Sequence, residues 1–123
     1  MKIYIAHSKG YDYKNELYKL IRNSHKLQQE NIILPHEFSD TSANTREFYN
    51  DIDIFIAECS YPATGLGIEL GWVYDSKIPI YCLHKNNMKI AGSIHSITNN
   101  IFAYSNPDEM LEIIEKIIKL EKK

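Results

Sequence analysis

Glu69 is the residue whose type and neighbours are best suited to chemistry. It follows Gly65 and Gly67, and glycines allow a backbone to approach a ligand closely. A helix that begins near Gly67 would place free N–H groups and a positive partial charge beside this carboxylate. An ionised carboxylate in that position could act as a nucleophile or stabilise a developing positive charge. The alternative is that Glu69 only complements the helix dipole, as acidic residues in a first helical turn often do.

Histidines and cysteines are the other side chains that could take part in catalysis or metal binding. The spacing of the histidines matches no helical metal-binding motif, so we expect no metal site, but strand-end histidines could contact a substrate. Cys59 follows a predicted strand, where a packed thiol is favoured over a reactive one, and two cysteines make no disulfide framework. The histidines considered are His7, His36, His84 and His95.

The elements that must position these residues alternate between strands and helices. Five apolar runs predict strands at residues 2–6, 31–34, 53–57, 78–83 and 101–104. Helical patterns cover residues 13–28, 45–51 and 67–75, and a long helix begins at Asn106-Pro107. This alternation predicts an α/β fold, a single-domain five-stranded mainly parallel sheet with helices on both faces, flavodoxin-like or Rossmann-like. Ligands bind such sheets beyond the strand carboxyl ends, so the expected site loops are 6–12, 35–44, 58–67 and 84–95.

Length and composition fit one domain over residues 1–123. The 14 Lys and Arg residues against 16 Asp and Glu residues give a net charge of −2, so no basic field would attract a nucleic-acid polymer or an anionic membrane. The apolar runs are far shorter than the ~20 residues that span a bilayer. The first residues show no signal-peptide pattern. We therefore expect a cytoplasmic protein with no membrane association.

One segment carries a specific pattern, the run AECSYPATGLGIELG at residues 57–71. It resembles the signature of the nucleoside 2-deoxyribosyltransferase superfamily, and it is most similar to the 2′-deoxynucleoside 5′-phosphate N-hydrolase branch. That signature contains a buried strand ending in Ala-Glu, then Ser or Thr, Pro, Gly-x-Gly and Glu-Leu-Gly. Asp53 and Glu69 also keep the family's separation. The resemblance extends over residues 1–83 and, more weakly, to residue 97.

The resemblance implies that Glu69 and Tyr4 are catalytic. Glu69 aligns with the glutamate that attacks the anomeric carbon and holds a covalent 2-deoxyribosyl intermediate, and Tyr4 aligns with the tyrosine that orients it. Without the resemblance, Tyr4 would be interpreted as a core residue of its strand. A deoxyribosyl centre lacks the electron-withdrawing 2′-hydroxyl, so its oxocarbenium-like transition state forms readily and one carboxylate can capture it.

The resemblance also implies substrate-binding positions and partners. The turn at residues 6–10 aligns with a loop over the sugar or base, and Ser93 lies near a phosphate contact that the family draws from a neighbouring subunit. The family implies a nucleoside or nucleotide as the small-molecule partner, no cofactor, no metal and a homodimer. The expected substrate-binding residues are Ala6, His7, Ser8, Gly10, His36, Thr45, Glu58, Ser60, Pro62, Thr64, Gly65, Gly67 and Ser93.

Two positions depart from the family pattern. The family's second catalytic aspartate, which assists the leaving base, is replaced here by Thr45. Its phosphate-binding serine, which follows the loop proline, is replaced by Ala63 next to Thr64, so a preference for monophosphates stays open. The candidates that could replace the missing carboxylate are Asp40, Glu47, Asp51 and the His36-Glu37 pair.

The sequence therefore predicts an enzyme that cleaves the N-glycosidic bond of 2′-deoxynucleosides or their 5′-monophosphates. Water as acceptor would make it a hydrolase, and a second base would make it a transferase. The alternatives are a non-catalytic nucleotide-binding module and an N-glycosidase for another nucleotide-like metabolite. Several aromatic residues could stack on a base or form the homodimer interface, of which the interface is favoured. These are Tyr49, Tyr61, Trp72 and Tyr74.

Overall fold

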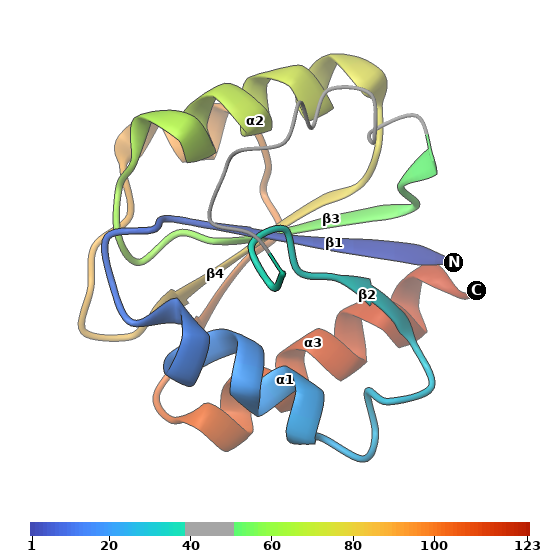
Figure 1. The fold of residues 1–123 in the computed structure, drawn as a ribbon. Coiled ribbons are helices and arrows are strands. Elements are labelled where there is room, and N and C mark those ends of the chain that lie inside the picture. Colours follow the sequence, from blue (N-terminus) through green and yellow to red (C-terminus); the bar gives the residue numbers. More distant parts are fainter. Residues whose placement is uncertain (39–50) are drawn as a thin grey trace.

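The computed structural model describes residues 1–38 and 51–123. Its five strands form one sheet in the order β2-β1-β3-β4-β5, and every pairing is parallel (Figure 1). This is the flavodoxin-like order, so the predicted fold class is confirmed. The strands are β1 (Lys2–His7), β2 (Asn31–Ile33), β3 (Ile54–Glu58), β4 (Ile80–Lys85) and β5 (Ile101–Tyr104).

Helices cover both faces of the sheet (Figure 1). On one face, the π-helical turn η1 (Lys14–Tyr18) continues into α1 (Lys19–Asn23), which packs beside α3 (Pro107–Glu121). On the other face lies α2 (Thr64–Ser76), with the short helix η3 (Gly92–Ser96) packed against the same core. The sheet is therefore enclosed between two layers, and its strands are apolar on both sides.

The two faces of the sheet build two separate cores. Successive strand residues point to opposite faces, so Ile3 and Ile54 pack toward α1 and α3 whereas Tyr4 and Phe55 pack toward α2. The buried positions of β3 are exposed by 1% or less, which agrees with its continuous apolar run. This alternation decides which strand side chains can reach α2, the helix that carries Glu69.

Several element boundaries differ from the sequence prediction. The first helix ends at Asn23 rather than residue 28, because Ser24 adopts an extended backbone and its N–H bonds to the carbonyl of Ile21. The helix that carries Glu69 begins at Thr64 rather than Gly67. The fourth strand begins two residues later than predicted, after Pro79. The helix predicted for 45–51 lies, apart from Asp51, outside the described residues.

The structure confirms the helix start that was predicted at Asn106-Pro107. The Asn106 side chain accepts a hydrogen bond from the backbone N–H of Glu109 at 2.8 Å, and Pro107 occupies the first turn. An N-cap of this kind satisfies one of the donors that a helix leaves open at its start. Met110, Ile114 and Ile117 are then buried against the sheet, as the apolar periodicity predicts.

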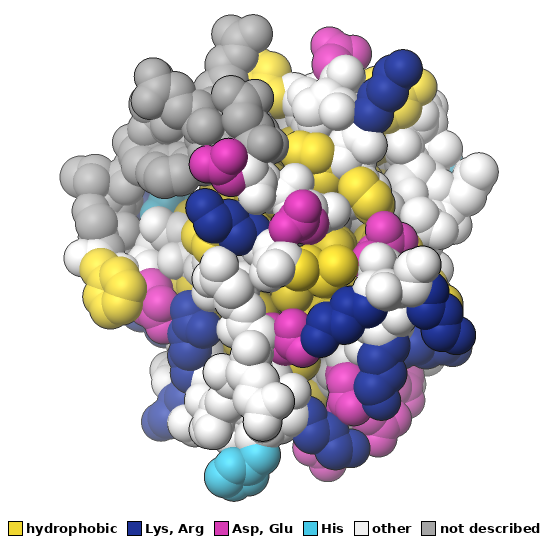
Figure 2. Space-filling model, turned by 90° about the vertical axis from the view of Figure 1, so that its right-hand side faces the viewer, with side chains coloured by type: hydrophobic (Ala, Val, Ile, Leu, Met, Phe, Trp, Pro, Cys, Tyr) yellow, Lys and Arg dark blue, Asp and Glu magenta, His cyan; other side chains and the backbone are white. Residues whose placement is uncertain are grey.

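Charges of both signs are mixed on the surface. Figure 2 shows Lys and Arg side chains beside Asp and Glu side chains on the face that carries both chain ends. Two of the ion pairs are Lys119 with Glu115 at 3.1 Å and Lys122 with Glu30 at 2.7 Å. In the part of the chain that the structure describes, no helix combines the length and apolarity needed to cross a membrane.

Candidate functional site

The strand order reverses between β1 and β3, because the chain places β2 on one side of β1 and β3 on the other. In open α/β sheets, ligands bind beyond the strand carboxyl ends at such a switch point. A cavity of about 290 Å³ lies there, and both Tyr4 and Glu69 line it. We call it the switch-point cavity. Its other lining residues are His7, Ser8, Lys9, Pro35, His36, Ala63, Gly65 and Leu66.

Glu69 lies deeper in its helix than the sequence predicts. Because α2 begins at Thr64, Glu69 is in the second turn, and the first turn contains no acidic residue. The helix begins at Thr64 because Ala63, the residue before it, has an extended backbone and is the N-cap. Glu69 was expected in or near the first turn, and it lies just beyond it, where charge–dipole stabilisation has already fallen off. The interpretation of Glu69 as a mere dipole complement loses its basis for the same reason.

Tyr4 reaches the cavity from the middle of β1. Its side chain is 1% exposed and its ring stacks on Phe55, with centroids 5.4 Å apart and planes 11° from parallel. The ring of Tyr4 is thus part of the core, as expected for a strand tyrosine, and the residue also lines the cavity that Glu69 lines.

His7 joins the two loops at the mouth of the cavity. Its Nδ1 lies 2.8 Å from the carbonyl of Ser8, and its Nε2 lies 2.6 Å from the Tyr18 hydroxyl, which also accepts the backbone N–H of His36 at 2.9 Å. This network assigns Nδ1 as the donor and Nε2 as the acceptor. Burial, opposed by the bond to Ser8 and aided by nearby His36 and Lys9, lowers the pKa of His7 to about 4. His7 is therefore neutral near pH 7.

The candidates that could replace the missing carboxylate lie in different places, as far as the structure describes them. Asp51 pairs with Lys2 at 3.9 Å, at the amino end of β1 and thus opposite the cavity. Glu37 binds the Arg22 guanidinium at 2.6 and 2.8 Å. His36 is the described candidate that lines the cavity. The remaining positions, Asp40, Thr45 and Glu47, lie outside the described residues.

Glu58 and Ser60 form a buried network on the opposite side of the sheet from Tyr4. Glu58 ends β3 and is 1% exposed; its carboxylate accepts the Ser60 N–H at 2.6 Å, the Ser60 hydroxyl at 3.0 Å and the Tyr104 hydroxyl. The Ser60 oxygen in turn accepts the N–H of Lys85 at 2.7 Å. Both residues were predicted to bind substrate, but neither lines the switch-point cavity. Here they tie the loop before α2 to β4 and β5.

The other predicted substrate-binding positions divide between several places. Pro62, Gly67 and Ser93 line a neighbouring cavity of about 220 Å³ between α2 and η3, which shares Ala63 and Leu66 with the switch-point cavity. Gly10 donates its N–H to the Ser8 hydroxyl at 2.9 Å. Ala6 is buried in the α2 core and Thr64 opens α2.

Sequence reasoning missed several residues of this region, among them Leu66 of the cavity lining. Lys9 and Pro35 line the cavity, and both lie in loops that the parallel-sheet argument had marked. Tyr18 had no such signal, because a tyrosine within a helical pattern is indistinguishable from a core residue until its partners are known. Its hydroxyl nevertheless holds the ring of His7.

The described histidines and cysteines are not arranged for metal binding or thiol chemistry. Within residues 1–38 and 51–123, no three His, Cys, Asp or Glu side chains gather closely enough to hold a metal ion. The His84 Nδ1 lies 2.9 and 3.0 Å from two backbone carbonyls. Cys59 and Cys82 are buried and free. A hydrogen bond to Cys82 and burial raise the pKa of the Cys59 thiol, which favours the packed, protonated form.

Comparison with known proteins gives a likeness in fold. No family model and no curated protein matches the chain. Among solved structures, the CMP N-glycosidase BcmB from Clostridium botulinum superimposes with a TM-score of 0.65 and 20% sequence identity. The alignment covers 94% of this chain and 99% of that one. At this level of identity the likeness concerns the arrangement of the chain: this protein has the same fold as a CMP N-glycosidase.

Proposed function

We propose that this protein cleaves the N-glycosidic bond of a 2′-deoxynucleoside or its 5′-monophosphate. The observation that carries the proposal is that Tyr4 and Glu69, from different elements, line one cavity at the strand-order switch. The fold shared with a CMP N-glycosidase supports the type of bond, and the segment at residues 57–71 supports the deoxyribosyl substrate.

In this mechanism the Glu69 carboxylate attacks the anomeric carbon of the sugar. The N-glycosidic bond breaks as the new ester bond forms, and the base leaves with the electron pair. The Tyr4 hydroxyl orients the carboxylate. Water then attacks the anomeric carbon, loses a proton and regenerates Glu69; a second base in place of water would yield a new nucleoside.

The leaving base needs a proton, and His7 is unsuited to supply it. The neutral His7 ring donates to the Ser8 carbonyl and accepts from Tyr18, so it carries no spare proton near pH 7. His36 lines the same cavity and an imidazole can donate a proton near neutral pH. We assign His36 to this role among the described residues.

A 5′-phosphate and a homodimer are both compatible with α2. Its first turn has neither an acidic residue nor a side-chain cap among the described residues, so its N–H groups suit an anion such as a 5′-phosphate.

The exposed side chains of Ile68, Trp72 and Tyr74 lie on the same helix and would be covered in a homodimer.

A second candidate substrate comes from the fold comparison. The neighbour's name specifies CMP, which is a ribonucleotide. A ribonucleoside 5′-monophosphate would use the same carboxylate attack, but its 2′-hydroxyl withdraws electrons and raises the barrier to the oxocarbenium-like transition state.

The test is chromatographic detection of free base from the purified protein. The panel contains the four common deoxynucleosides, their 5′-monophosphates and the corresponding ribonucleotides, each with and without an acceptor base. Glu69→Gln should lower the rate by at least about a thousandfold, because it removes the nucleophile. Tyr4→Phe should lower it by about ten- to a hundredfold, the effect of one hydrogen bond to a charged group. The exposed Glu112→Gln on α3 is the matched control.

Each result has a distinct meaning. Base release from ribonucleotides alone would replace the deoxyribosyl substrate with the second candidate, and a new nucleoside in the acceptor samples would identify a transferase. If no substrate releases base, and a bound nucleotide is recovered unchanged after long incubation, the protein is a nucleotide-binding module and the proposal is wrong.

A further inference from the structure

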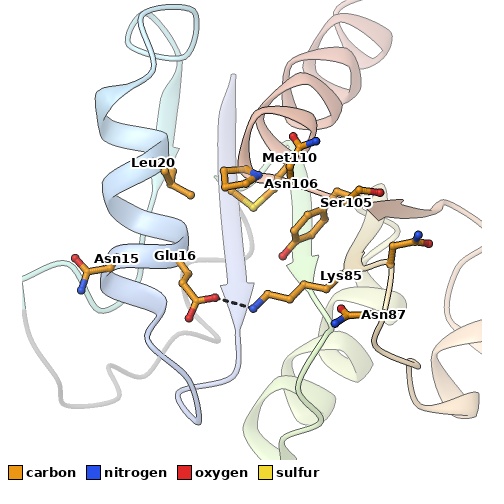
Figure 3. A pocket seen from close by; sticks show the side chains of 11 residues that line it. Asn15, Glu16, Leu20, Lys85, Asn87, Ser105, Asn106 and Met110 are labelled. Carbon is orange, nitrogen blue, oxygen red and sulfur yellow. Dashed lines mark hydrogen bonds and ion pairs between the residues drawn. The ribbon is translucent and has the colours of Figure 1, made fainter.

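A larger cavity lies on the other side of the sheet from Tyr4. It has a volume of about 640 Å³ and opens between the first helix, the ends of β4 and β5, and the start of α3 (Figure 3). It shares no lining residue with the switch-point cavity. Four asparagines border it, Asn15, Asn86, Asn87 and Asn106, so we call it the amide groove. Its volume is in the range of small-molecule sites.

The charges in the amide groove are already compensated. Glu16 extends from the first helix and Lys85 from β4, and their side chains meet at 2.6 Å across the groove (Figure 3). Lys85 also donates to the Tyr61 hydroxyl at 2.8 Å. The start of α3 is capped by Asn106 and carries Asp108 and Glu109 in its first turn. An anionic ligand would have to displace Glu16 and approach these acids, so the groove favours a neutral one.

The hydrogen-bonding capacity of the groove is largely unused. Within the described chain, the side-chain amides of Asn86 and Asn87 form no hydrogen bond. Asn15 uses its amide nitrogen on Asp12, which leaves its oxygen, and Asn106 uses its oxygen in the α3 cap, which leaves its nitrogen. Each amide group therefore offers a donor, an acceptor or both.

Tyr11 lies behind the groove, next to Lys85, although it is not one of the residues that line the groove. The Tyr11 hydroxyl is buried and has no hydrogen-bond partner among the described residues. Its ring stacks on Tyr61 with centroids 4.5 Å apart, and Lys85 lies 5.8 Å from its centroid. Burial, together with the nearby Glu58, Tyr104 and Glu16, raises the pKa of this hydroxyl, so it stays protonated. Buried unpaired donors are uncommon in proteins.

Apart from Ser105 and Tyr104, the remaining lining is apolar. Leu20 and Met110 face each other across the groove in Figure 3, and Pro107 also lines it. Met110 is 1% exposed, so this surface is part of the main core. A planar ring could cover the apolar surface with its faces while its edge meets the amides.

We propose that the amide groove is a second binding site, for a neutral heterocycle with adjacent donors and acceptors, as in a free nucleobase. Carboxamide side chains match such edges because they present a donor and an acceptor side by side. The proposal goes beyond the proposed cleavage and does not depend on it, since no groove residue acts in that reaction.

The experiment titrates the ¹⁵N-labelled full chain with cytosine, uracil, adenine, hypoxanthine and, separately, inorganic phosphate, and follows the backbone amide chemical shifts. We expect saturable shifts in residues 85–87 and 104–106. The double variant Asn86→Ala/Asn87→Ala should weaken this binding about tenfold, the effect of one or two neutral hydrogen bonds. Both residues are exposed, so folding should be unaffected. Asn99→Ala, an exposed asparagine outside the groove, is the matched control.

Three results would overturn the proposal. The first is the absence of saturable shifts with every base, and the second is shifts confined to the residues around Glu69. The third is tighter binding of inorganic phosphate than of any base at the groove, which would make it an anion site. None of these results depends on whether the protein cleaves a glycosidic bond, so failure here and failure of the proposed function are separable.

Discussion

At the end of β1, the His7 ring is held on both sides, with one nitrogen toward the Ser8 carbonyl and the other toward the Tyr18 hydroxyl. Protonation would remove the acceptor that Tyr18 needs and would place a charge in a buried position. The neutral form of His7 therefore joins two loops of the switch-point cavity.

This arrangement predicts a pH-dependent loss of stability. The pKa of His7 is lowered to about 4 in the folded protein, compared with about 6.5 in an unfolded chain. Between these values the unfolded chain binds more protons, so the His7 contribution is complete above about pH 6.5 and is lost as the pH falls toward 4. The loss should approach about 3 kcal/mol.

Urea unfolding between about pH 7 and pH 4 measures this contribution. His7→Gln should unfold more easily than wild type at neutral pH, and the difference in the free energy of unfolding should shrink as the pH falls. The exposed His25→Gln is the control for the loss of an imidazole. Parallel pH profiles for wild type and His7→Gln would contradict the assigned neutral state.

At the scale of elements, α2 determines where Glu69 lies. The helix starts directly after the extended Ala63, which moves Glu69 into the second turn. At its other end, Lys77 has a left-handed backbone, with φ 66° and ψ 19°. Glycine is the usual residue at such a helix end, because a Cβ atom makes this conformation unfavourable.

We therefore expect Lys77→Gly to stabilise the protein by about 0.5–1 kcal/mol, because glycine adopts the left-handed conformation without steric cost. The midpoint of urea unfolding should rise while its slope is unchanged. Lys77→Ala, which keeps the Cβ atom and removes the charge, should show no such gain. An equal gain in both variants would mean that the lysine charge, not the backbone, is responsible.

At the scale of the whole molecule, the two layers of helices differ in their outer surfaces. The exposed part of α2 includes Ile68, Trp72 and Tyr74, which are exposed by 48%, 38% and 53%. The outer surface of α3 carries exposed charged residues such as Lys116 and Lys119. A homodimer would bury the apolar surface of α2 and leave the charged surface in water.

We predict that the protein is a dimer at micromolar concentrations and that Ile68→Lys raises its dissociation constant by at least about tenfold. The reason is that a lysine charge in an apolar contact is costly to desolvate. Sedimentation velocity over a range of concentrations measures this. Leu120→Lys, a matched change of an exposed aliphatic residue on α3, should leave the equilibrium unaltered. A wild type that sediments as a monomer throughout would exclude the dimer.

The sequence by itself determined the elements and the fold class. The run at residues 54–57 is apolar throughout because both faces of β3 are covered, and the signal at Asn106-Pro107 acts within one helical turn. Burial and capping are local requirements, so they leave a local trace. The start of the helix that carries Glu69 was predicted three residues late, because the extended backbone of one loop residue, Ala63, decides it.

Only the tertiary structure decided which chemical groups meet. Strand order brings Tyr4 beside Glu69, and the alternation of side chains across the sheet sends Glu58 to the opposite side, although Glu58 belongs to the same sequence motif. The amide groove likewise combines segments far apart in the chain. Such contacts depend on strand pairing and on the packing of helices against each face, which no single segment specifies.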